Sequence, residues 1–375
     1  MKQKSLMLIA IGLLYCCILT AQTTYVFVGT FNRDKQKEGI AVYTLDEKSG
    51  ELLKVQSVTG ILNPSFLAIG SDSNFLYACT ESQTPQSGYI NSFRFDKQTG
   101  RLTELNRQKT GGENPVYLTT SKDNRFLLST NYTEAGLDVF LLNNNGTVGN
   151  RIQTIQYKEG SGATEGQDIS HSHSVIFSPD QGYVLVPDLG ADEIRSYRFN
   201  SSLAQPVSTE SYRQNRAALG SGPRHICFHP NQKNVYCVEE IGGSLSYYQF
   251  HKGKLRLKQR VMLHNSSTGK HSSADVHISP DGKFLYASNR GDENNIAIFS
   301  IRPNGRLQLV DYQSTMGNHP RMFALSPQGQ FLVVANQFSN NLRVFKRNER
   351  TGKLTPTGQD IPIESPSCVQ IKTYH

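Results

Sequence analysis

The sequence predicts an all-β protein, a seven-bladed β-propeller of four-stranded antiparallel blades, and three observations support this prediction. One phrase recurs about every 50 residues along the chain, which is a spacing typical of propeller blades. The recurring segments, such as FLYAS at 284–288, alternate with the period of a strand rather than that of a helix. The two chain ends hold complementary parts of one further copy.

Each copy begins with a loop, continues with a short apolar strand and a tight turn of the Ser-Pro-Asp-Gly type, and then forms a second strand. A third strand follows, and a glycine turn precedes the fourth. Six copies have both of their first two strands in one piece, at 63–77, 114–128, 171–185, 222–236, 272–286 and 319–333. A parallel β-helix has shorter coils and lacks hairpin turns, so we do not expect that fold.

The seventh copy is divided between the ends of the chain. Residues 365–371 match only the first strand of the phrase, and residues 24–29 match only the second. Because each half lacks the strand that the other provides, we expect the two segments to pair within one blade and to close the ring. Residues 22–375 then form a single propeller domain, although length alone suggests two or more domains.

Residues 1–21 have the layout of a secretory signal peptide. Two lysines precede an apolar run at 6–19, and the small residue Ala21 offers a cleavage point. The run is shorter than the roughly 20 residues that a membrane-spanning helix needs. We therefore expect an exported protein, periplasmic or extracellular, without a membrane span. Lipid attachment at Cys16 or Cys17 is the alternative, which the bulky tyrosine directly before the first cysteine disfavours.

Composition excludes several classes of function. The formal net charge of +8 is spread without a basic block, so we expect no binding of nucleic acid, although a pocket for a small anion is compatible with it. The closest histidine pair, His171 and His173, lacks accompanying carboxylates, so we expect neither a metal site nor a cofactor. Four cysteines after the signal peptide lack metal-ligand spacing and are expected to be buried thiols: Cys79, Cys227, Cys237 and Cys368.

Superposing the copies predicts which residues surround the mouth of the central channel. In a propeller the first strand of each blade begins at the face to which the second strand returns, so both of these strand ends look into one axial mouth. Adjoining copies carry polar residues there: His173, Arg224 and Arg321 where the first strand begins, and Asp188, Glu240, Arg290 and Gln337 where the second strand ends. This asymmetry predicts a site on one side of the mouth.

The arginines in this set exceed the acids that could neutralise them. Buried charges are costly without a partner, and a guanidinium fork suits a carboxylate or a phosphate. We therefore expect a small anionic ligand, bound by a monomer; structural ion pairs of Arg224 and Arg321 with Asp188 and Glu240 are the alternative. Asp275 lies near the same strands and is expected to contact the ligand or to support the site.

Five segments carry a family resemblance: HSHSV at 171–175, GPRH at 222–225, YCVEEI at 236–241, ADVHISPDG at 274–282 and YASNRG at 286–291. They are similar to motifs of the propeller-type lactonase family, which contains bacterial 6-phosphogluconolactonases and fungal carboxymuconate lactonizing enzymes. The resemblance extends over the whole chain after residue 21, and the motifs occur in the same order and on the corresponding blades as in that family. It implies the seven-bladed fold that the repeats predict independently.

The resemblance also implies roles for individual residues. The fungal cyclases use a histidine, two arginines and a glutamate around the lactone, and by motif these fall on His173, Arg224, Glu240 and Arg290. The bacterial pattern usually reads Asn-Glu where this chain has two glutamates at 239–240. The glutamate of the motif carries over, and the extra carboxylate beside it is a departure from the pattern.

The implied activity is the opening of 6-phosphogluconolactone to 6-phosphogluconate. Glu240 or His173 would activate the water, and Arg224 with Arg290 would bind the oxyanion or the anionic group of the substrate. Arg321 and Gln337 would orient the ligand. Export leaves the identity of the lactone open, because sugar phosphates belong to cytoplasmic metabolism.

Two other functions remain compatible with the sequence. One is a lactonizing cycloisomerase that uses the same residues to move a proton to carbon. The other is an exported propeller that binds a glycan or a protein without catalysis, since one fold serves many functions. The chain has no tryptophan, and its aromatic residues fall mostly in the strand phrases, which disfavours the binding propeller.

Overall fold

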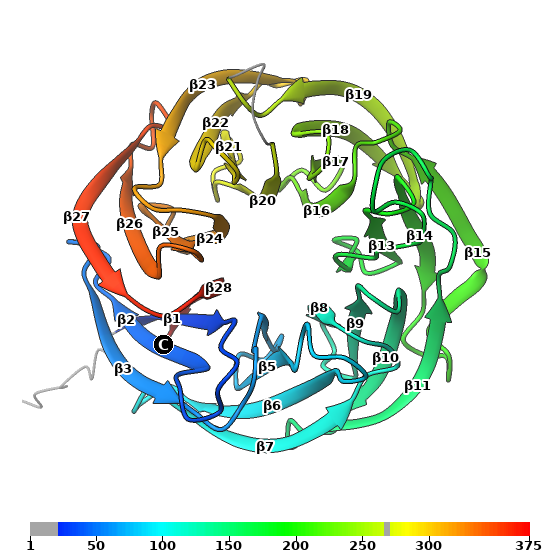
Figure 1. Ribbon diagram of the computed structural model, residues 1–375, viewed down its shortest axis with the longest axis horizontal. Helices are drawn as coiled ribbons and strands as arrows, with labels where there is room; N and C mark the ends of the chain where they lie inside the picture. The colour runs from blue at the N-terminus through cyan, green and yellow to red at the C-terminus, as the bar shows by residue number, and fades with distance from the viewer. Residues whose placement is uncertain (1–21, 266–270) are drawn as a thin grey trace, which may run out of the picture.

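The computed structural model describes residues 22–265 and 271–375. Within these residues the chain forms seven four-stranded antiparallel sheets, arranged as blades around a central axis (Figure 1). This confirms the predicted fold class. No helix in the described part of the chain is long and apolar enough to span a membrane. The predicted signal peptide at 1–21 lies outside the described residues and stays a prediction.

Each blade extends from an innermost strand at the axis to an outermost strand at the rim. In that order, blade 1 consists of β28 (Pro366–Tyr374), β1 (Thr23–Thr30), β2 (Ile40–Leu45) and β3 (Leu52–Val58). Blade 2 consists of β4 (Phe66–Ile69), β5 (Phe75–Thr80), β6 (Tyr89–Asp96) and β7 (Arg101–Lys109). Blade 3 consists of β8 (Pro115–Thr120), β9 (Phe126–Asn131), β10 (Gly136–Leu142) and β11 (Val148–Gln156).

The remaining four blades have the same order of strands. Blade 4 consists of β12 (Ile176–Phe177), β13 (Tyr183–Asp188), β14 (Glu193–Phe199) and β15 (Val207–Arg216). Blade 5 consists of β16 (Pro223–Phe228), β17 (Asn234–Glu239), β18 (Ser244–His251) and β19 (Lys254–Met262). Blade 6 consists of β20 (Ser273–Ile278), β21 (Phe284–Asn289), β22 (Asn295–Ile301) and β23 (Leu307–Ser314). Blade 7 consists of β24 (Pro320–Leu325), β25 (Phe331–Asn336), β26 (Asn341–Arg347) and β27 (Leu354–Pro362).

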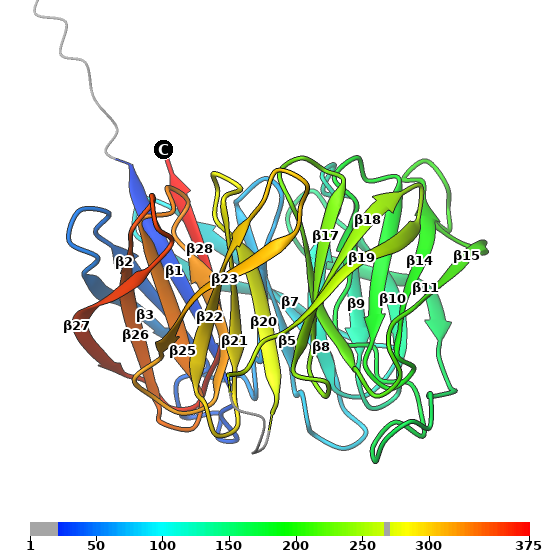
Figure 2. The same ribbon diagram turned by 90° about the horizontal axis from the view of Figure 1, so that it is seen from above.

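Blade 1 closes the ring in the way the divided copy predicts. The C-terminal strand β28 pairs antiparallel with β1, and the register runs from Thr23 opposite Tyr374 to Val28 opposite Val369. Both described chain ends therefore lie together at one face of the propeller (Figure 2). The first strands of the blades begin at the other face. This pairing places strands from both ends of the described chain in one sheet and so closes the ring.

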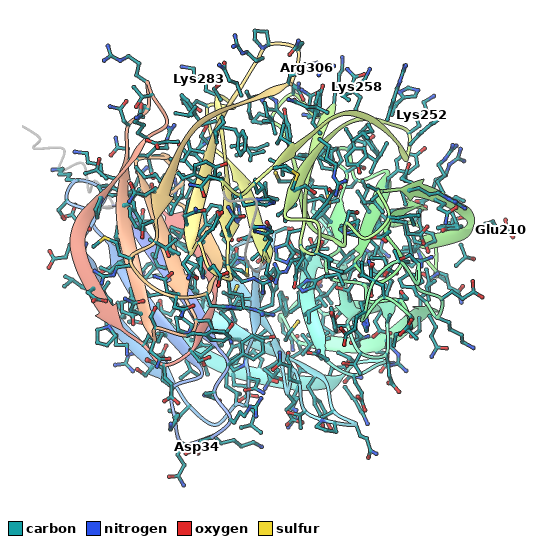
Figure 3. The ribbon with its side chains drawn as sticks, turned by 45° about the horizontal axis from the view of Figure 1, so that its top comes forward. Asp34, Glu210, Lys252, Lys258, Lys283 and Arg306 are labelled. Atoms are coloured by element: carbon teal, nitrogen blue, oxygen red, sulfur yellow. The ribbon has the colours of Figure 1, made fainter. Side chains whose placement is uncertain are left out.

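Apolar side chains pack between neighbouring blades. One cluster joins Phe27 of β1, Leu67 of β4 and Phe93 of β6, each with no exposed surface. The four cysteines of the described residues are free thiols, three of them buried and Cys227 partly buried, as predicted. Charged side chains such as Lys252 and Arg306 project outward from the periphery of the ring (Figure 3).

The glycine turns that recur in the sequence serve this packing between blades. Gly352, in the β26–β27 turn, has a φ of +75° and lies against the ring of Phe284 in blade 6, so that a Cβ at this position would overlap the ring. Gly146 in blade 3 packs against Phe75 of blade 2 in the same way. A side chain is therefore excluded at these turns both by the backbone conformation and by the neighbouring blade.

We expect Gly352→Ala to lower the free energy of unfolding by about 1–3 kcal/mol more than Gly358→Ala, because only the first substitution also overpacks a blade interface. Gly358 is the matched control, since its φ is +91° but no atom lies within 4 Å of a Cβ built there. Urea unfolding of the two variants measures the difference. Equal losses would mean that the aromatic contact contributes nothing beyond backbone strain.

Candidate active site

The inner strands β16, β20 and β24 lie around the central axis of the ring (Figure 1), and the pairing of β16 and β24 is irregular at the end where the sequence predicts the mouth of the channel. The pairing of β16 with β17 shifts register between Pro223 and His225, which leaves Arg224 as an extra residue at the start of the strand. The same shift between Pro320 and Met322 leaves Arg321 in the equivalent position of blade 7. Such bulges re-aim a side chain, so the repeated irregularity presents arginines from two blades.

Glu240 lies between two arginines of this mouth. Its Oε2 is 2.8 Å from Nε of Arg224, and its Oε1 is 2.8 Å from NH2 of Arg290. The two guanidinium groups are almost fully buried, whereas the Glu240 side chain is 24% exposed. Burial acts to raise the pKa of the Glu240 carboxyl, but the positive charges of Arg290, Arg224 and Arg321 outweigh it and lower that pKa to about 2. Glu240 is therefore ionised near neutral pH.

Backbone and side-chain acceptors hold the two arginines in place. NH1 of Arg224 donates to the carbonyl of Ala274 and lies 3.2 Å from Nε2 of His225. NH2 of Arg290 donates to Oγ of Ser272 at 2.7 Å, and its Nε donates to the carbonyl of that serine at 3.3 Å. Burial, together with the charge of Arg290, lowers the pKa of Arg224 to about 10. Arg224 thus stays charged near neutral pH.

Arg321 is a third cation at the same mouth. Its guanidinium lies over the ring of Phe31, 4.7 Å from the ring centroid, and it makes no ion pair with any of the described residues. Burial, with the charges of Arg224 and Arg290, lowers its pKa to about 9. The mouth thus holds three guanidinium groups but one carboxylate, which pairs with only two of them. The excess positive charge suits an anionic ligand.

His173 is buried beside this cluster. Its backbone N–H donates to the carbonyl of Pro187 at 3.0 Å, but its Nδ1 is buried without a hydrogen-bond partner among the described residues. The rings of Tyr132 and His225 contact it edge to face, with centroids 5.5 and 5.3 Å away. Burial and the charge of Arg224 hold the pKa of His173 well below its usual value. The imidazole is therefore neutral, and its Nδ1 is a buried polar atom whose hydrogen-bonding capacity is unused among the described residues.

Asp275 lies beneath the cluster, between two histidines. One oxygen is 2.9 Å from Nδ1 of His225, and the other is 2.9 Å from Nε2 of His277. A neutral His225 that donates from Nδ1 to Asp275 keeps its Nε2 as an acceptor for Arg224. Both carboxylate oxygens of Asp275 are thus engaged with imidazoles, which makes it a support for His225.

Asp188 is engaged in another part of blade 4. Its carboxylate accepts from the backbone N–H of His171 at 2.8 Å and that of Ala191 at 3.0 Å, and from the Nε and NH2 of Arg195 at 3.2 and 3.1 Å. Ser170 also donates to it. The structure does not bring Asp188 into hydrogen-bonding contact with the arginines or the glutamate of the cluster, although its place in the repeat is equivalent to that of Glu239.

Gln337 reaches the same region from blade 7. Its Nε2 lies 3.5 Å from Oγ of Ser365, and its Oε1 is buried without a hydrogen-bond partner among the described residues. Its backbone N–H donates to the carbonyl of His319 at 3.0 Å. Gln337 thus carries a buried acceptor whose hydrogen-bonding capacity is unused among the described residues.

Sequence reasoning missed two kinds of residue at this mouth. Phe31 and Tyr132 occupy the repeat position of Glu240, but a search for charged groups passes over aromatic rings. His319, whose Nε2 is 3.4 Å from NH1 of Arg290, directly precedes the proline of the phrase. Burial and the charges of Arg290 and Arg321 lower the pKa of His319 to about 3. A scan of all polar and aromatic residues at both strand ends would have found all three.

The comparisons with known proteins agree with this architecture. A 6-phosphogluconolactonase from Formosa agariphila is 40% identical over 93% of this chain and 99% of its own length. A second 6-phosphogluconolactonase, from Bacillus subtilis, is 30% identical over 93% of this chain and 98% of its own length. The solved structure of a periplasmic gluconolactonase from Pseudomonas aeruginosa superposes with a TM-score of 0.87 at 32% identity, covering 94% of this chain and 99% of that one. The family described as "Lactonase, 7-bladed beta-propeller" matches residues 25–371, and the chain belongs to this lactonase family.

Proposed function

We propose that this protein is a lactonase that hydrolyses an anionic sugar lactone, 6-phosphogluconolactone, to the open-chain acid 6-phosphogluconate. The observation that carries the proposal is the excess of positive charge at the mouth, where Glu240 pairs with the buried Arg224 and Arg290 and the partly buried Arg321 adds a third guanidinium group. A phosphorylated substrate supplies the negative charge that this cluster lacks. The names of the two relatives support the same substrate, and the Pseudomonas structure supports the reaction type.

In the proposed mechanism His173 is the general base. The oxygen of a water molecule bonds to the lactone carbonyl carbon while one of its protons passes to Nδ1 of His173. The carbonyl electrons move onto the carbonyl oxygen, which Arg224 and Arg290 stabilise. The bond from that carbon to the ring oxygen then breaks, and the ring oxygen takes the proton from His173. The products are a hydroxyl group and a carboxylic acid, which ionises.

The charge of the substrate changes the pKa of His173. The neighbouring arginines and burial together hold the pKa of His173 well below its usual value, which makes the imidazole a weak base in the free protein. A bound phosphate offsets the charge of Arg224 and Arg321 and raises the pKa of His173 toward neutrality. Glu240 is the other candidate base, but both of its oxygens are held by arginines. We assign it to the alignment of Arg224 and Arg290.

Export belongs to the same proposal. We propose that residues 1–21 direct the protein out of the cytoplasm, and the Pseudomonas structure, which is described as periplasmic, supports this location. A lactone outside the cytoplasm could lack the phosphate. Comparing phosphorylated with unphosphorylated gluconolactone therefore tests the substrate class directly.

We expect hydrolysis of 6-phosphogluconolactone, and we expect Arg321→Gln to raise KM for this lactone by about 10- to 100-fold, the contribution of a hydrogen bond to a charged group. KM for unphosphorylated gluconolactone should change by less than about threefold, because that substrate lacks the anion that Arg321 binds. Initial rates, corrected for spontaneous hydrolysis, measure both. Equal effects on the two lactones would contradict the role of Arg321 in phosphate binding. Activity on neither lactone would overturn the proposed function and favour a carboxylated lactone or the cycloisomerase reaction.

A further inference from the structure

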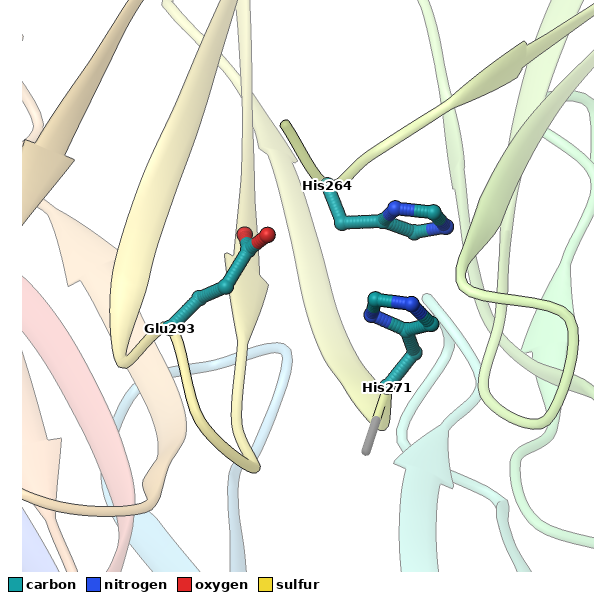
Figure 4. A group of neighbouring side chains, drawn as sticks. All are labelled: His264, His271 and Glu293. Carbon is teal, nitrogen blue, oxygen red and sulfur yellow. The ribbon is translucent and has the colours of Figure 1, made fainter. Parts of the chain in front are cut away.

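A second group of ligating side chains lies outside the arginine cluster. His264 and His271 are carried by the connection between β19 and β20, and Glu293 is carried by the turn between β21 and β22. The two imidazole rings stack, with centroids 3.5 Å apart and planes 10° from parallel, and the carboxylate lies beside them (Figure 4). One nitrogen of each ring and one carboxylate oxygen all lie within 4.8 Å of one another. The sequence predicts no metal site, and the spacing of these residues along the chain does not indicate one.

The surrounding residues hold this group in place. The backbone N–H of Asn265 donates to Oε1 of Glu293 at 3.1 Å, and Nδ2 of Asn295 donates to Oε2 at 3.1 Å. These two hydrogen bonds hold the Glu293 carboxylate in place. All three ligating side chains belong to partly buried residues. The group is thus a supported arrangement rather than a set of freely exposed side chains.

The β17–β18 turn makes room for the histidine pair. A Cβ built at Gly243 would lie 2.8 Å from Cδ2 of His264 and 3.1 Å from Cβ of His271, and the φ of this glycine is +54°. Only glycine fits here without displacing the imidazole or straining the turn. Three segments from two blades therefore meet at the histidine pair.

We propose that His264, His271 and Glu293 form a binding site for a divalent transition metal, with the chemistry that suits Zn²⁺. Two imidazole nitrogens and one carboxylate oxygen are a zinc ligand set, whereas Ca²⁺ and Mg²⁺ prefer oxygen ligands throughout. Ligand distances of about 2.0–2.2 Å require the three atoms to move closer together. Because a metal lies in the plane of each imidazole that binds it, the stacked rings would splay apart by rotation of their side chains. Three protein ligands leave a further coordination position for water or an anion.

A metal at this site would link the two segments that flank Arg290, one carrying His271 and the other carrying Glu293. Ser272 directly follows His271 and accepts hydrogen bonds from the Arg290 backbone N–H at 2.9 Å and from its NH2 group at 2.7 Å. Glu293 lies three residues after Arg290 in the same turn. Bridging His271 to Glu293 therefore joins both flanks of the Arg290 contact. The metal site does not depend on the proposed substrate, since it rests on residues outside the arginine cluster.

Calorimetric titration with Zn²⁺ of the full protein, after treatment with a chelator and removal of the chelator, tests the proposal. We expect one site per chain, and we expect His264→Ala and His271→Ala each to weaken that site by more than about tenfold, since loss of even a supporting partner of a metal ligand typically costs 10- to 100-fold. His251→Ala is the matched control, because His251 is exposed at the end of β18 and should leave the affinity unchanged. Circular dichroism of each variant shows whether the fold is intact.

A spectroscopic measurement separates a built site from scattered surface histidines. Co²⁺ in place of Zn²⁺ should give the visible absorption of a site with nitrogen and oxygen ligands, and Glu293→Gln should alter that spectrum because it exchanges a charged ligand for a neutral one. At one Zn²⁺ concentration the Tm should also rise more in the wild-type protein and in the His251 variant than in the His264 variant. Equal Zn²⁺ affinity in wild-type protein and in the His264 and His271 variants would overturn the proposal. Such a result would leave the lactonase proposal untouched.

Discussion

Replacing His173 by alanine is expected to lower kcat for lactone hydrolysis by about 10²- to 10⁴-fold, the usual contribution of a general base. The reason is that Nδ1 of His173 is buried without a partner among the described residues and that the imidazole is close enough to Arg224 for the charge of that arginine to lower its pKa. Initial-rate kinetics on 6-phosphogluconolactone measure the loss. His229→Ala is the matched control, since His229 lies in the turn after β16, at the other end of that strand from Arg224.

Glu240→Gln distinguishes the two candidate bases. If Glu240 only aligns the arginines, the Glu240→Gln variant keeps part of its activity. The pH dependence of this remaining activity then still reflects the pKa of His173. A loss in the Glu240 variant as large as that in the His173 variant, with an altered pH profile, would shift the base assignment to Glu240. Full activity in both variants would exclude this mechanism.

The pH profile follows from the direction of the pKa shift. Because the pKa of His173 in the free protein lies well below 6.5, the base is neutral throughout the physiological range, and kcat/KM should fall only below pH 6.5. If the bound phosphate raises this pKa, the acid limb of kcat should lie at higher pH than that of kcat/KM.

The ion pairs of Glu240 do not contribute to this acid limb. The pKa of about 2 lies below the usual value for a glutamate, so their stabilisation is complete above that usual value and is lost only as the pH falls through about 2.

Replacing Arg224 by glutamine should lower kcat by about 10²- to 10³-fold, the cost of removing one donor to a developing oxyanion. Arg224 is expected to have this effect because it is fixed by Ala274 and His225 and is paired with the one carboxylate of the cluster. Its loss also leaves Glu240 with one fewer cation, so a change in kcat must be separated from a change in folding. Kinetics at saturating substrate, together with thermal unfolding, provide both numbers.

Arg347→Gln is the control for the cost of removing a buried guanidinium. Arg347 is 4% exposed and pairs with Asp281 at 3.5 Å, at the end of β26 away from the channel mouth. We expect a comparable loss of stability in the two variants but a loss of kcat only in Arg224→Gln. An Arg224 variant whose kcat is unchanged while its Tm falls would make Arg224 a structural residue.

The repeat pattern of the sequence determined the architecture, because each blade needs the same strand lengths, turns and alternation to pack against its neighbours. The closure of the ring could also be predicted, since residues 24–29 and 365–371 carry complementary halves of one repeat. The same regularity brought Arg224, Glu240 and Arg290 to one mouth. Equivalent positions in a propeller lie at equivalent heights along the axis, so aligning the copies also aligns the groups that face the channel.

The tertiary structure decided which partners these groups take. Asp188 and Glu239 hold equivalent positions in the repeat, yet Arg195 and Arg260 engage them away from the cluster. Asp275 likewise lies under His225, and His264, His271 and Glu293 meet across two blades. Partner choice depends on rotamers and on contacts between segments far apart in sequence, which a pattern within one repeat does not contain. The sequence by itself therefore determined the ring and brought Arg224, Glu240 and Arg290 to its mouth, and only the packing of neighbouring blades decided which further residues join them and which charges other residues neutralise.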